Sequence, residues 1–539
     1  MRIRIFFTIA LAGMVVLVSG AAWAAFTSEV WVDDDFNSAT EGWGENYFSS
    51  IQDGIDEVAP GGTVNVAAGT YDESLSVTKD NLTIKAADGE SPVIQQAEIF
   101  SGGVRRLIDI RGDNVLFEGL EVVGNGKNDL EDVTGSYVGI SVSGQGVIVK
   151  NNIIRNLLTG IQTTTANEVG SVEIYDNTIS NVAVGISLQN DNNTIDGNDI
   201  TAIDVGFGIA SFNTTWGANQ ITTDGYEATI SGDSYKPIYL GSIQDGINAV
   251  SDGATIKVDV GAFIEDVNLN KEITLVGPNV DVNPNTGTRE DEATITGQIT
   301  VESDNVVING FTVTNPGETS AIIIQNNDPS YSDIIIYSNI INNVGSAALA
   351  ANVHAIYLDR GPDDVSILNN KIMNIKSGAN KSVSAIGILD TASTDTSDDV
   401  LVQGNVISNI ESADVDDRWG AYGIIVNNGA GSLNLKIINN AISNLEGLWA
   451  HAIGLEGDTP NAVVTGNIID NVIAHNTVKD SVGIFFEDNP SGNTEIVSDN
   501  KFSNTEYGVA IHPNLLSSNP NMIVTAENNY WATQTQVMM

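Results

Sequence analysis

Apolar and polar residues alternate in short runs along this chain, and a recurring asparagine phrase separates the runs. Val172 and Ile174 are two positions apart, so they share one face of a predicted strand. Ile179 follows Ile174 by five positions, an odd step that strict alternation would place on the opposite face. The chain is therefore expected to bend at Asn177, because asparagine adopts the left-handed conformation more readily than other non-glycine residues. The phrase occurs nine times, at residues 152–156, 177–181, 198–200, 339–343, 370–374, 405–409, 440–444, 467–471 and 500–504.

The spacing of the phrases predicts a solenoid with a fixed core and loops of variable length. Within each half of the chain, neighbouring phrases are between 21 residues (Asn177 to Asn198) and 35 residues (Asn370 to Asn405) apart. Stacked coils would bring the asparagines within about 4.8 Å of one another, where amide ladders form. A leucine-rich repeat is the alternative, but the apolar positions are mostly Ile and Val and show no helical period. We predict an all-β fold, a right-handed parallel β-helix with short capping helices.

A second, longer repeat predicts two capping helices. Residues 50–55 return as residues 242–247, 192 positions later, and Glu73 is matched in the same way by Glu265. Ile51, Ile55 and Val58 follow helical spacing, and Ser50 and Ser242 are suitable N-caps. Because a solenoid needs its open end covered, a second cap in mid-chain predicts two tandem β-helical units. We expect the units at 25–235 and 236–531, followed by a short tail at 532–539 that suggests truncation; one continuous solenoid with a decorated coil is the alternative.

These motifs resemble the pectin-lyase-like superfamily of right-handed parallel β-helices, and in particular its secreted bacterial and archaeal surface and adhesin-like members. The resemblance covers almost the whole chain after its first residues. It implies the fold but not one activity, because the superfamily includes lyases, hydrolases, epimerases, adhesins and surface-layer-like proteins. Besides the asparagine phrase, the matching stretches are Trp31–Phe36, Ser50–Ile55, Gly61–Val66, Gly69–Tyr71 and Val282–Arg289.

The beginning of the chain predicts export. Arg2 and Arg4 precede an apolar run that is short for a membrane span, and small residues follow at Ala22 and Ala24, so residues 1–24 are predicted to be a secretory signal peptide. No later stretch has the length of a transmembrane anchor. The protein is therefore expected to be secreted, to the exterior or cell surface, with the periplasm as an alternative. Without cysteine, its stability must come from the repeated core.

The charge excludes one class of partner. The chain has 22 basic and 69 acidic residues and a formal charge of −47, which argues against binding to nucleic acid.

The candidate ligand-binding residues lie on the connections between the asparagine phrase and the next strand in five consecutive coils. The connections 344–354, 375–384, 410–421, 445–451 and 472–481 are predicted to be long loops, stacked as one wall. Exposed tryptophan offers a flat face to a sugar ring, and mixed charges suit hydroxyls and uronates. The alternative is that each Trp packs its own loop onto the solenoid. The glycan-binding candidates are Trp419, Trp449, Arg418, Lys376, Lys479, His354, His451 and His475.

A second set of acidic residues lies near the end of the following strand. Asp359, Asp390, Glu456 and Glu487 occupy similar positions of successive coils, within about one residue of register. Stacked carboxylates repel one another, and a hard cation with oxygen ligands would relieve the repulsion. These four residues are the candidate calcium ligands, with solvated turn carboxylates as the alternative.

No recognisable catalytic constellation accompanies these residues, and the catalytic residues stay unassigned. Arg360-Gly-Pro362 partly resembles a pectate-lyase signature, but Val365 stands where a second Arg is expected. We therefore expect a secreted protein, noncatalytic or weakly catalytic, that binds polysaccharide or cell-surface glycans and is adhesin-like or surface-layer-like. A polysaccharide lyase or epimerase acting on uronates, with Lys or Arg as the base, is one alternative, and a structural extracellular spacer is another.

Overall fold

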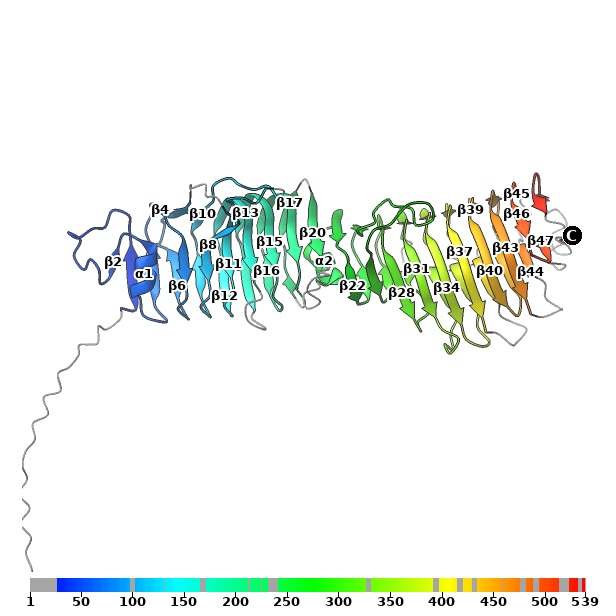
Figure 1. The fold of residues 1–539 in the computed structure, drawn as a ribbon, viewed down its shortest axis with the longest axis horizontal. Coiled ribbons are helices and arrows are strands. Elements are labelled where there is room, and N and C mark those ends of the chain that lie inside the picture. Colours follow the sequence, from blue (N-terminus) through cyan, green and yellow to red (C-terminus); the bar gives the residue numbers. More distant parts are fainter. Residues whose placement is uncertain are drawn as a thin grey trace, which may run out of the picture.

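The computed structural model shows an elongated right-handed parallel β-helix, in which strands of successive coils stack along the long axis (Figure 1). The fold expected from the asparagine phrase is thus confirmed. The predicted signal peptide lies outside the described residues. The structure describes residues 27–96, 102–130, 132–164, 171–211, 214–223, 225–230, 241–325, 331–390, 397–413, 420–428, 434–457, 459–475, 481–487, 494–512, 523–531 and 536–538.

Four parallel sheets form the walls of the solenoid. Sheet I contains β1 (Glu29–Val32), β2 (Tyr47–Phe48), β3 (Thr63–Val66), β6 (Thr83–Ala86), β9 (Leu116–Glu118), β12 (Val147–Lys150), β14 (Val172–Tyr175), β16 (Thr194–Asp196) and β18 (Thr215–Trp216). Sheet II runs through both halves of the chain and contains β4 (Thr70–Asp72), β5 (Leu75–Val77), β7 (Val93–Gln95), β8 (Arg105–Ile110), β10 (Glu121–Val123), β11 (Tyr137–Val142), β13 (Ile153–Thr163), β15 (Thr178–Leu188), β17 (Asp199–Ile209), β19 (Gln220–Thr223), β20 (Tyr226–Ile230), β21 (Ala254–Val258), β24 (Ile273–Val276), β27 (Val307–Asn309), β30 (Ile334–Tyr337), β33 (Val365–Leu368), β36 (Leu401–Gln403), β39 (Lys436–Ile438), β42 (Val463–Thr465), β45 (Thr494–Ser498) and β48 (Ile523–Thr525).

The other two sheets belong to the second half of the chain. Sheet III contains β22 (Gly261–Ile264), β25 (Ala293–Thr296), β28 (Thr312–Pro316), β31 (Ile340–Gly345), β34 (Lys371–Ser377), β37 (Val406–Ser412), β40 (Ala441–Gly447), β43 (Ile468–Ala474), β46 (Lys501–Ser503) and β49 (Tyr530–Trp531). Sheet IV contains β23 (Val267–Leu269), β26 (Ile299–Val301), β29 (Ile322–Gln325), β32 (Val353–Asp359), β35 (Val383–Asp390), β38 (Ala421–Asn428), β41 (Ala450–Leu455), β44 (Ser481–Phe486), β47 (Tyr507–Ile511) and β50 (Gln536–Met538).

The aliphatic residue of each phrase points into the core, as predicted. Ile341, Ile407, Ile442 and Ile469 belong to one continuous file of paired positions in sheet III, and each is at most 1% exposed. Ile179 holds the equivalent position in the first half and is fully buried. Most of these coils thus add a β-branched side chain to the core at the same place, and Phe502 takes that place in the last phrase. The constant core position explains why the phrase tolerates loops of such different lengths.

The first asparagine of each phrase forms a buried ladder. Asn405 is fully buried, and its Nδ2 donates to Oδ1 of Asn440 at 3.0 Å and to the carbonyl of Ile367 at 2.8 Å. Asn440 repeats this pattern with Asn467. The amides therefore satisfy both one another and the backbone at the corner, as buried polar groups must.

The backbone conformation at the corner differs from our expectation. Asn177 does not adopt the left-handed conformation; Asp176 before it (φ 50°) and Asn181 at the end of the phrase (φ 52°) do. The side chain of Asn177 points inward and joins the ladder. The first asparagine of the phrase is therefore the ladder residue, and the residue before it, Asp176 in this coil, takes the bend.

Two short helices cap coils in the same way. In α1 (Ile51–Glu57) the backbone N–H groups of Ile51 and Gln52 donate to the Glu73 carboxylate at 2.7 and 3.0 Å. In α2 (Ile243–Ala249) the same groups of Ile243 and Gln244 donate to Glu265 at 2.9 and 3.2 Å. The Ser50 and Ser242 side chains accept from the N–H three residues later, which confirms both as N-caps.

The two halves meet at α2, in the middle of the rod (Figure 1). Sheet I ends at β18 and sheets III and IV begin at β22 and β23, so only sheet II continues across the junction. There β20 and β21 pair through Ala228–Ile256, Thr229–Lys257 and Ile230–Val258. The side chain of Ile230 packs against Gly246 of α2, where an added Cβ would lie 2.4 Å from Ile230 Cδ1.

The Val282–Arg289 segment fastens a loop across several coils. Arg289 is only 8% exposed and forms a two-pronged ion pair with Glu292 at 2.7 and 2.8 Å. Its Nη1 also donates to the carbonyls of Val282 and Ser338, at 3.1 and 2.8 Å. A buried, fully engaged guanidinium of this kind holds the loop in one conformation, which gives this motif a structural role.

Candidate functional site

The five predicted connections all lie at one corner, between sheet III and sheet IV. The pairs β31/β32, β34/β35, β37/β38, β40/β41 and β43/β44 flank this corner in successive coils. The connections are shorter than expected, because inward-facing residues such as Ile375 and Leu445 prolong the strands of sheet III beyond the second asparagine. Between β40 and β41 only residues 448–449 lie outside strands. The predicted residues Trp419, Arg418 and Lys479 lie outside the described residues.

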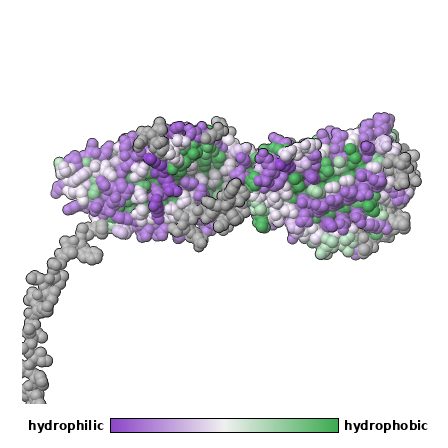
Figure 2. Space-filling model, in the orientation of Figure 1, coloured by the Kyte–Doolittle hydropathy of each residue, from purple (hydrophilic) through white to green (hydrophobic). Residues whose placement is uncertain are grey.

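A shallow groove runs along sheet III beside this corner. It has a volume of about 340 Å³ and spans four successive coils. Its floor is a ladder of four asparagines, two exposed and two partly exposed. Each donates from Nδ2 to Oδ1 of the asparagine one coil before, at 2.7 to 3.3 Å: Asn374, Asn409, Asn444 and Asn471. Figure 2 shows that hydrophobic and hydrophilic residues form bands along the axis over this half of the molecule.

Charged residues line one side of the groove, at paired positions of successive strands. Lys376 pairs in register with Glu411, and Glu411 with Glu446. The Lys376 ammonium contacts the Glu411 carboxylate at 2.7 Å, and His475 Nε2 lies 2.9 Å from Glu446 Oε1. All four side chains are about half exposed. Because exposed ion pairs contribute little to stability, these groups are available to a ligand at small cost.

Across the corner, the outer face of sheet IV carries a row of polar and aromatic side chains. His354, Ser384, Tyr422 and His451 occupy paired positions of successive strands and are at most 7% exposed. His354 Nδ1 lies 2.8 Å from Ser384 Oγ, and its ring packs against Tyr357 with 5.2 Å between the centroids. Burial lowers the pKa of His354 to about 4, so this imidazole is neutral in the folded protein at neutral pH.

Trp449 closes over this row. Its ring meets Tyr422 and His451 edge to face, with centroids 5.6 and 4.8 Å apart, and His451 in turn packs on Phe485 at 4.1 Å. Trp449 itself is only partly buried. Trp449 thus packs onto the solenoid and also presents part of its ring to solvent. Packing as a structural residue and exposure to a sugar ring are therefore compatible at this position.

A buried carboxylate completes the cluster. The side chain of Glu456 is 8% exposed, and its Oε1 accepts a 2.7 Å hydrogen bond from the Tyr422 hydroxyl. The same oxygen lies 3.9 Å from His451 Nδ1. Burial, together with the negative charges of Glu456 and Glu487, raises the pKa of Tyr422 well above its usual value, so the phenol stays a hydrogen-bond donor.

The candidate calcium ligands are distributed over several coils. Asp359 pairs in register with Leu389, and its carboxylate accepts from the Tyr357 hydroxyl and lies 3.8 Å from Arg360. Asp390 lies one position further along β35, opposite Asn428, and its side chain is outside the described part of the chain. Glu456 and Glu487 occupy the same position of neighbouring coils, since their N–H groups donate to Val426 and Leu455 in the same pattern.

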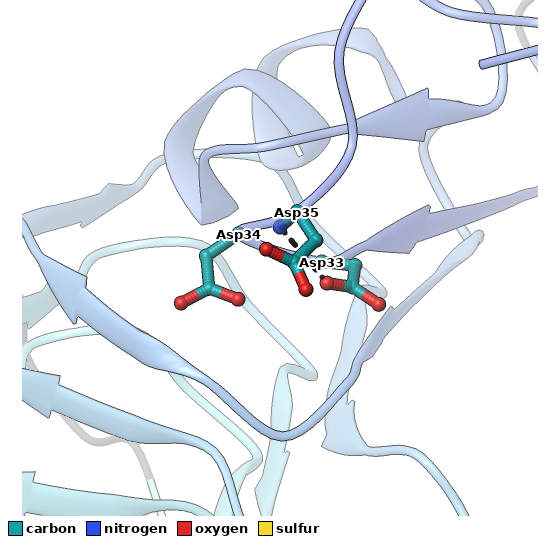
Figure 3. Close-up of side chains that lie close together, drawn as sticks. All are labelled: Asp33, Asp34 and Asp35. Carbon is teal, nitrogen blue, oxygen red and sulfur yellow. Dashed lines mark hydrogen bonds between the residues drawn. The ribbon is translucent and has the colours of Figure 1, made fainter.

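Within the described residues, the one group of three acidic side chains that converge is at the other end of the rod. Asp33, Asp34 and Asp35 follow β1 (Figure 3). Asp33 accepts from the N–H of Asp35 at 3.0 Å and Asp34 from that of Thr70 at 3.2 Å, so two of these carboxylates stabilise the turn itself.

Sequence reasoning missed Tyr422, Phe485, Glu411 and Glu446, which complete the two clusters. None stands in a motif. The available signal was the strand register: Tyr422 stands opposite His451, and Glu411 and Glu446 stand opposite Lys376 in consecutive coils. Aligning the coils on the second asparagine would have placed Glu411 and Glu446 beside Lys376. Tyr422 and Phe485 follow connections of different length, so the same alignment does not place them.

Comparison with known proteins gives one family match, over part of the chain. The profile of the family described as periplasmic copper-binding protein (NosD) matches residues 105–223, which lie in the first half of the rod. No curated protein gives a significant match. In the described part of the chain, no helix has the length and hydrophobicity needed to cross a membrane.

Several solved β-helix structures are similar to this chain at low sequence identity. A pectate lyase, Pel9A, is 14% identical, covering 52% of this chain and 79% of its own, with a TM-score of 0.28. The tailspike protein of E. coli bacteriophage HK620, solved with a pentasaccharide, is 13% identical over 82% of this chain and 76% of its own, with a TM-score of 0.33. PfbA, a surface adhesin of Streptococcus pneumoniae, is 12% identical over 85% of each chain, with a TM-score of 0.28.

Proposed function

We propose that this protein is exported and binds an extended polysaccharide along the groove of sheet III, without turning it over. The observation that carries the proposal is the repetition of one set of side chains over four coils: an exposed or partly exposed asparagine, and two positions later a charged or apolar residue. Asn374, Asn409 and Asn444 each use one N–H and one acceptor position within the ladder, which leaves further hydrogen-bonding capacity on each amide. A ligand with hydroxyls at regular intervals meets equivalent partners on every coil.

The mixed charges fit this ligand class better than a strongly anionic one. Lys376 is already paired with Glu411, and Glu446 adds a second carboxylate to the same row. A uronate chain would meet more negative than positive charge among the described residues of the groove. Hydroxyl groups donate to carboxylates and accept from ammonium groups, so a neutral polysaccharide can form hydrogen bonds with both kinds of side chain.

Copper, which the name of the matched family suggests, does not fit the matched segment. Residues 105–223 contain no His, Cys or Met, the residue types that copper sites use. All four His residues of the chain lie in the second half, outside the match. Similarity over this segment therefore supports the fold and export to the periplasm or exterior, and we derive no copper chemistry from it.

A glycan array on the protein without residues 1–24, followed by calorimetry on the best ligand, tests the proposal. The double variant Asn409→Gly, Asn444→Gly removes two amides from the floor of the groove while glycine keeps the left-handed conformation of both positions. We expect at least a tenfold loss of affinity. The matched control, Asn156→Gly with Asn181→Gly, removes the equivalent ladder pair in the first half and should bind normally. Unchanged affinity in the groove variant, or absence of any glycan ligand, would refute the proposal.

A further inference from the structure

The end of sheet IV presents two carboxylates and a histidine in consecutive coils. Glu456 N–H donates to Val426 at 2.8 Å, Glu487 N–H to Leu455 at 3.0 Å and His512 N–H to Phe486 at 2.8 Å. The three residues therefore hold the same position of three neighbouring coils, with backbones about 4.8 Å apart. These residues follow the ends of the sheet IV strands, whereas the corner beside the groove of sheet III lies at the beginning of those strands.

The two carboxylates have different surroundings. Glu456 is buried and held by the Tyr422 hydroxyl at 2.7 Å. Glu487 is partly exposed, and within the described residues it takes part in no ion pair. Like charges one coil apart destabilise each other, so a cation placed between them is favoured. The buried member cannot move away, because its hydrogen bond fixes it.

The neighbours of these carboxylates are aromatic. Phe485 stands two positions before Glu487, so both point outward from β44. The ring of Phe485 packs against His451 at 4.1 Å and meets His512 edge to face at 6.3 Å, and it remains partly exposed. A calcium or magnesium ion prefers six or more oxygen ligands, whereas an organic ammonium group is bound by a carboxylate together with an aromatic face.

We propose that Glu487, Glu456 and Phe485 bind the ammonium group of an amino sugar. This inference rests on the proposed function in taking the ligand to be a glycan, and it adds the class of sugar. The ammonium would donate to Glu487 while a C–H face of the sugar ring covers Phe485. Glu456, whose Oε1 is held by Tyr422, contributes its charge from below. An N-acetylated sugar lacks the positive charge and would lose this attraction.

Calorimetry with two matched probes tests the assignment: a tetramer of β-1,4-linked glucosamine and the same tetramer N-acetylated. At a pH where the amines are protonated and the carboxylates ionised, we expect the glucosamine tetramer to bind at least tenfold more tightly. Glu487→Gln should reduce that affinity about 10- to 100-fold, the loss of one charge-assisted contact. Phe485→Leu, which keeps an apolar side chain, should reduce it several-fold. Glu45→Gln removes an equal charge from an exposed position near the other end of the rod, outside both proposed sites, and serves as the control.

The outcomes separate this inference from the proposed function. Equal binding of the two tetramers, or an unaffected Glu487→Gln variant, would overturn the assignment even if the groove variants abolish binding of a long glycan. Displacement of the glucosamine tetramer by calcium, without any preference over the N-acetylated form, would assign the carboxylate pair to the metal. Conversely, glucosamine binding that depends on Glu487 but survives Asn409→Gly with Asn444→Gly would support this site and count against the groove.

Discussion

Replacing His354 by Asn should remove part of the acid sensitivity of the fold. The neutral His354 ring is buried between Tyr357 and Ser384, with a pKa of about 4. In the unfolded chain the imidazole titrates near its ordinary value of about 6.5, so below that pH the unfolded state takes up the proton first. Stability is therefore lost as the pH falls from about 6.5 to about 4, by about 2 kcal/mol at pH 5 and about 3 kcal/mol at pH 4.

Asparagine is the suitable replacement because its amide occupies the place of Nδ1, the atom that faces Ser384. Equilibrium urea unfolding followed by circular dichroism, at several values from about pH 7 to about pH 4, gives the free energy of unfolding of both proteins. The carboxylates contribute equally to both, so the difference between the two curves isolates the imidazole. His475→Asn, which removes a half-exposed imidazole, is the control. Parallel curves for the His354→Asn variant and the parent would show that burial of this ring does not control its protonation.

Three further changes test the core, the cap and the predicted metal. Ile407→Ala should cost about 2–5 kcal/mol by opening a cavity in a fully buried file, measured by the urea midpoint, and a cost below 1 kcal/mol would contradict that packing. Glu265→Ala removes three hydrogen bonds that cap α2 and should lower the melting temperature, whereas Glu265→Asp should lower it less if those bonds matter. If the predicted file of Asp359, Asp390, Glu456 and Glu487 binds calcium, the ion should raise the melting temperature in calorimetry, reversibly with a chelator; no shift would leave the file as solvated surface.

The fold was predictable because one phrase performs the same physical task in every coil. The alternation of Ile and Val defines which side faces the core, and the asparagine that accompanies it predicts a corner. The error at Asn177 shows the limit of that reasoning. Propensity alone suggested that asparagine takes the left-handed bend, but the left-handed residues are Asp176 and Asn181, and Asn177 is needed inside the ladder. Local preference was overridden by the need to satisfy buried backbone groups at the corner.

The candidate site was only partly predictable, because it depends on register between coils. Lys376 and His475 were expected on loops beside His354 and His451, yet the structure separates them onto sheet III and sheet IV, on either side of one corner. Lys376 stands opposite Glu411, and His451 stands opposite Tyr422. Each of these partners comes from a neighbouring coil, about 30 residues away in the chain. A single sequence does not state which coil positions stand opposite one another when the loops differ in length.

Two glycines on the outer face of sheet IV leave space for the rings of His354 and Tyr422. An added Cβ at Gly387 would lie 3.0 Å from the His354 ring, and one at Gly454 would lie 3.0 Å from the Tyr422 ring and 3.5 Å from Glu456. Each ring thus lies across the glycine of the next coil, where any larger residue would press on it. An outward glycine weakens a strand, because it brings no side chain to pack and costs more entropy on folding. Sheet IV has such a glycine beside the buried His354 and another beside the buried Tyr422 and Glu456. Each of these two glycines lowers the local stability of its strand. Under the proposed function, these glycines leave the space in which the rings of His354 and Tyr422 are held in fixed positions.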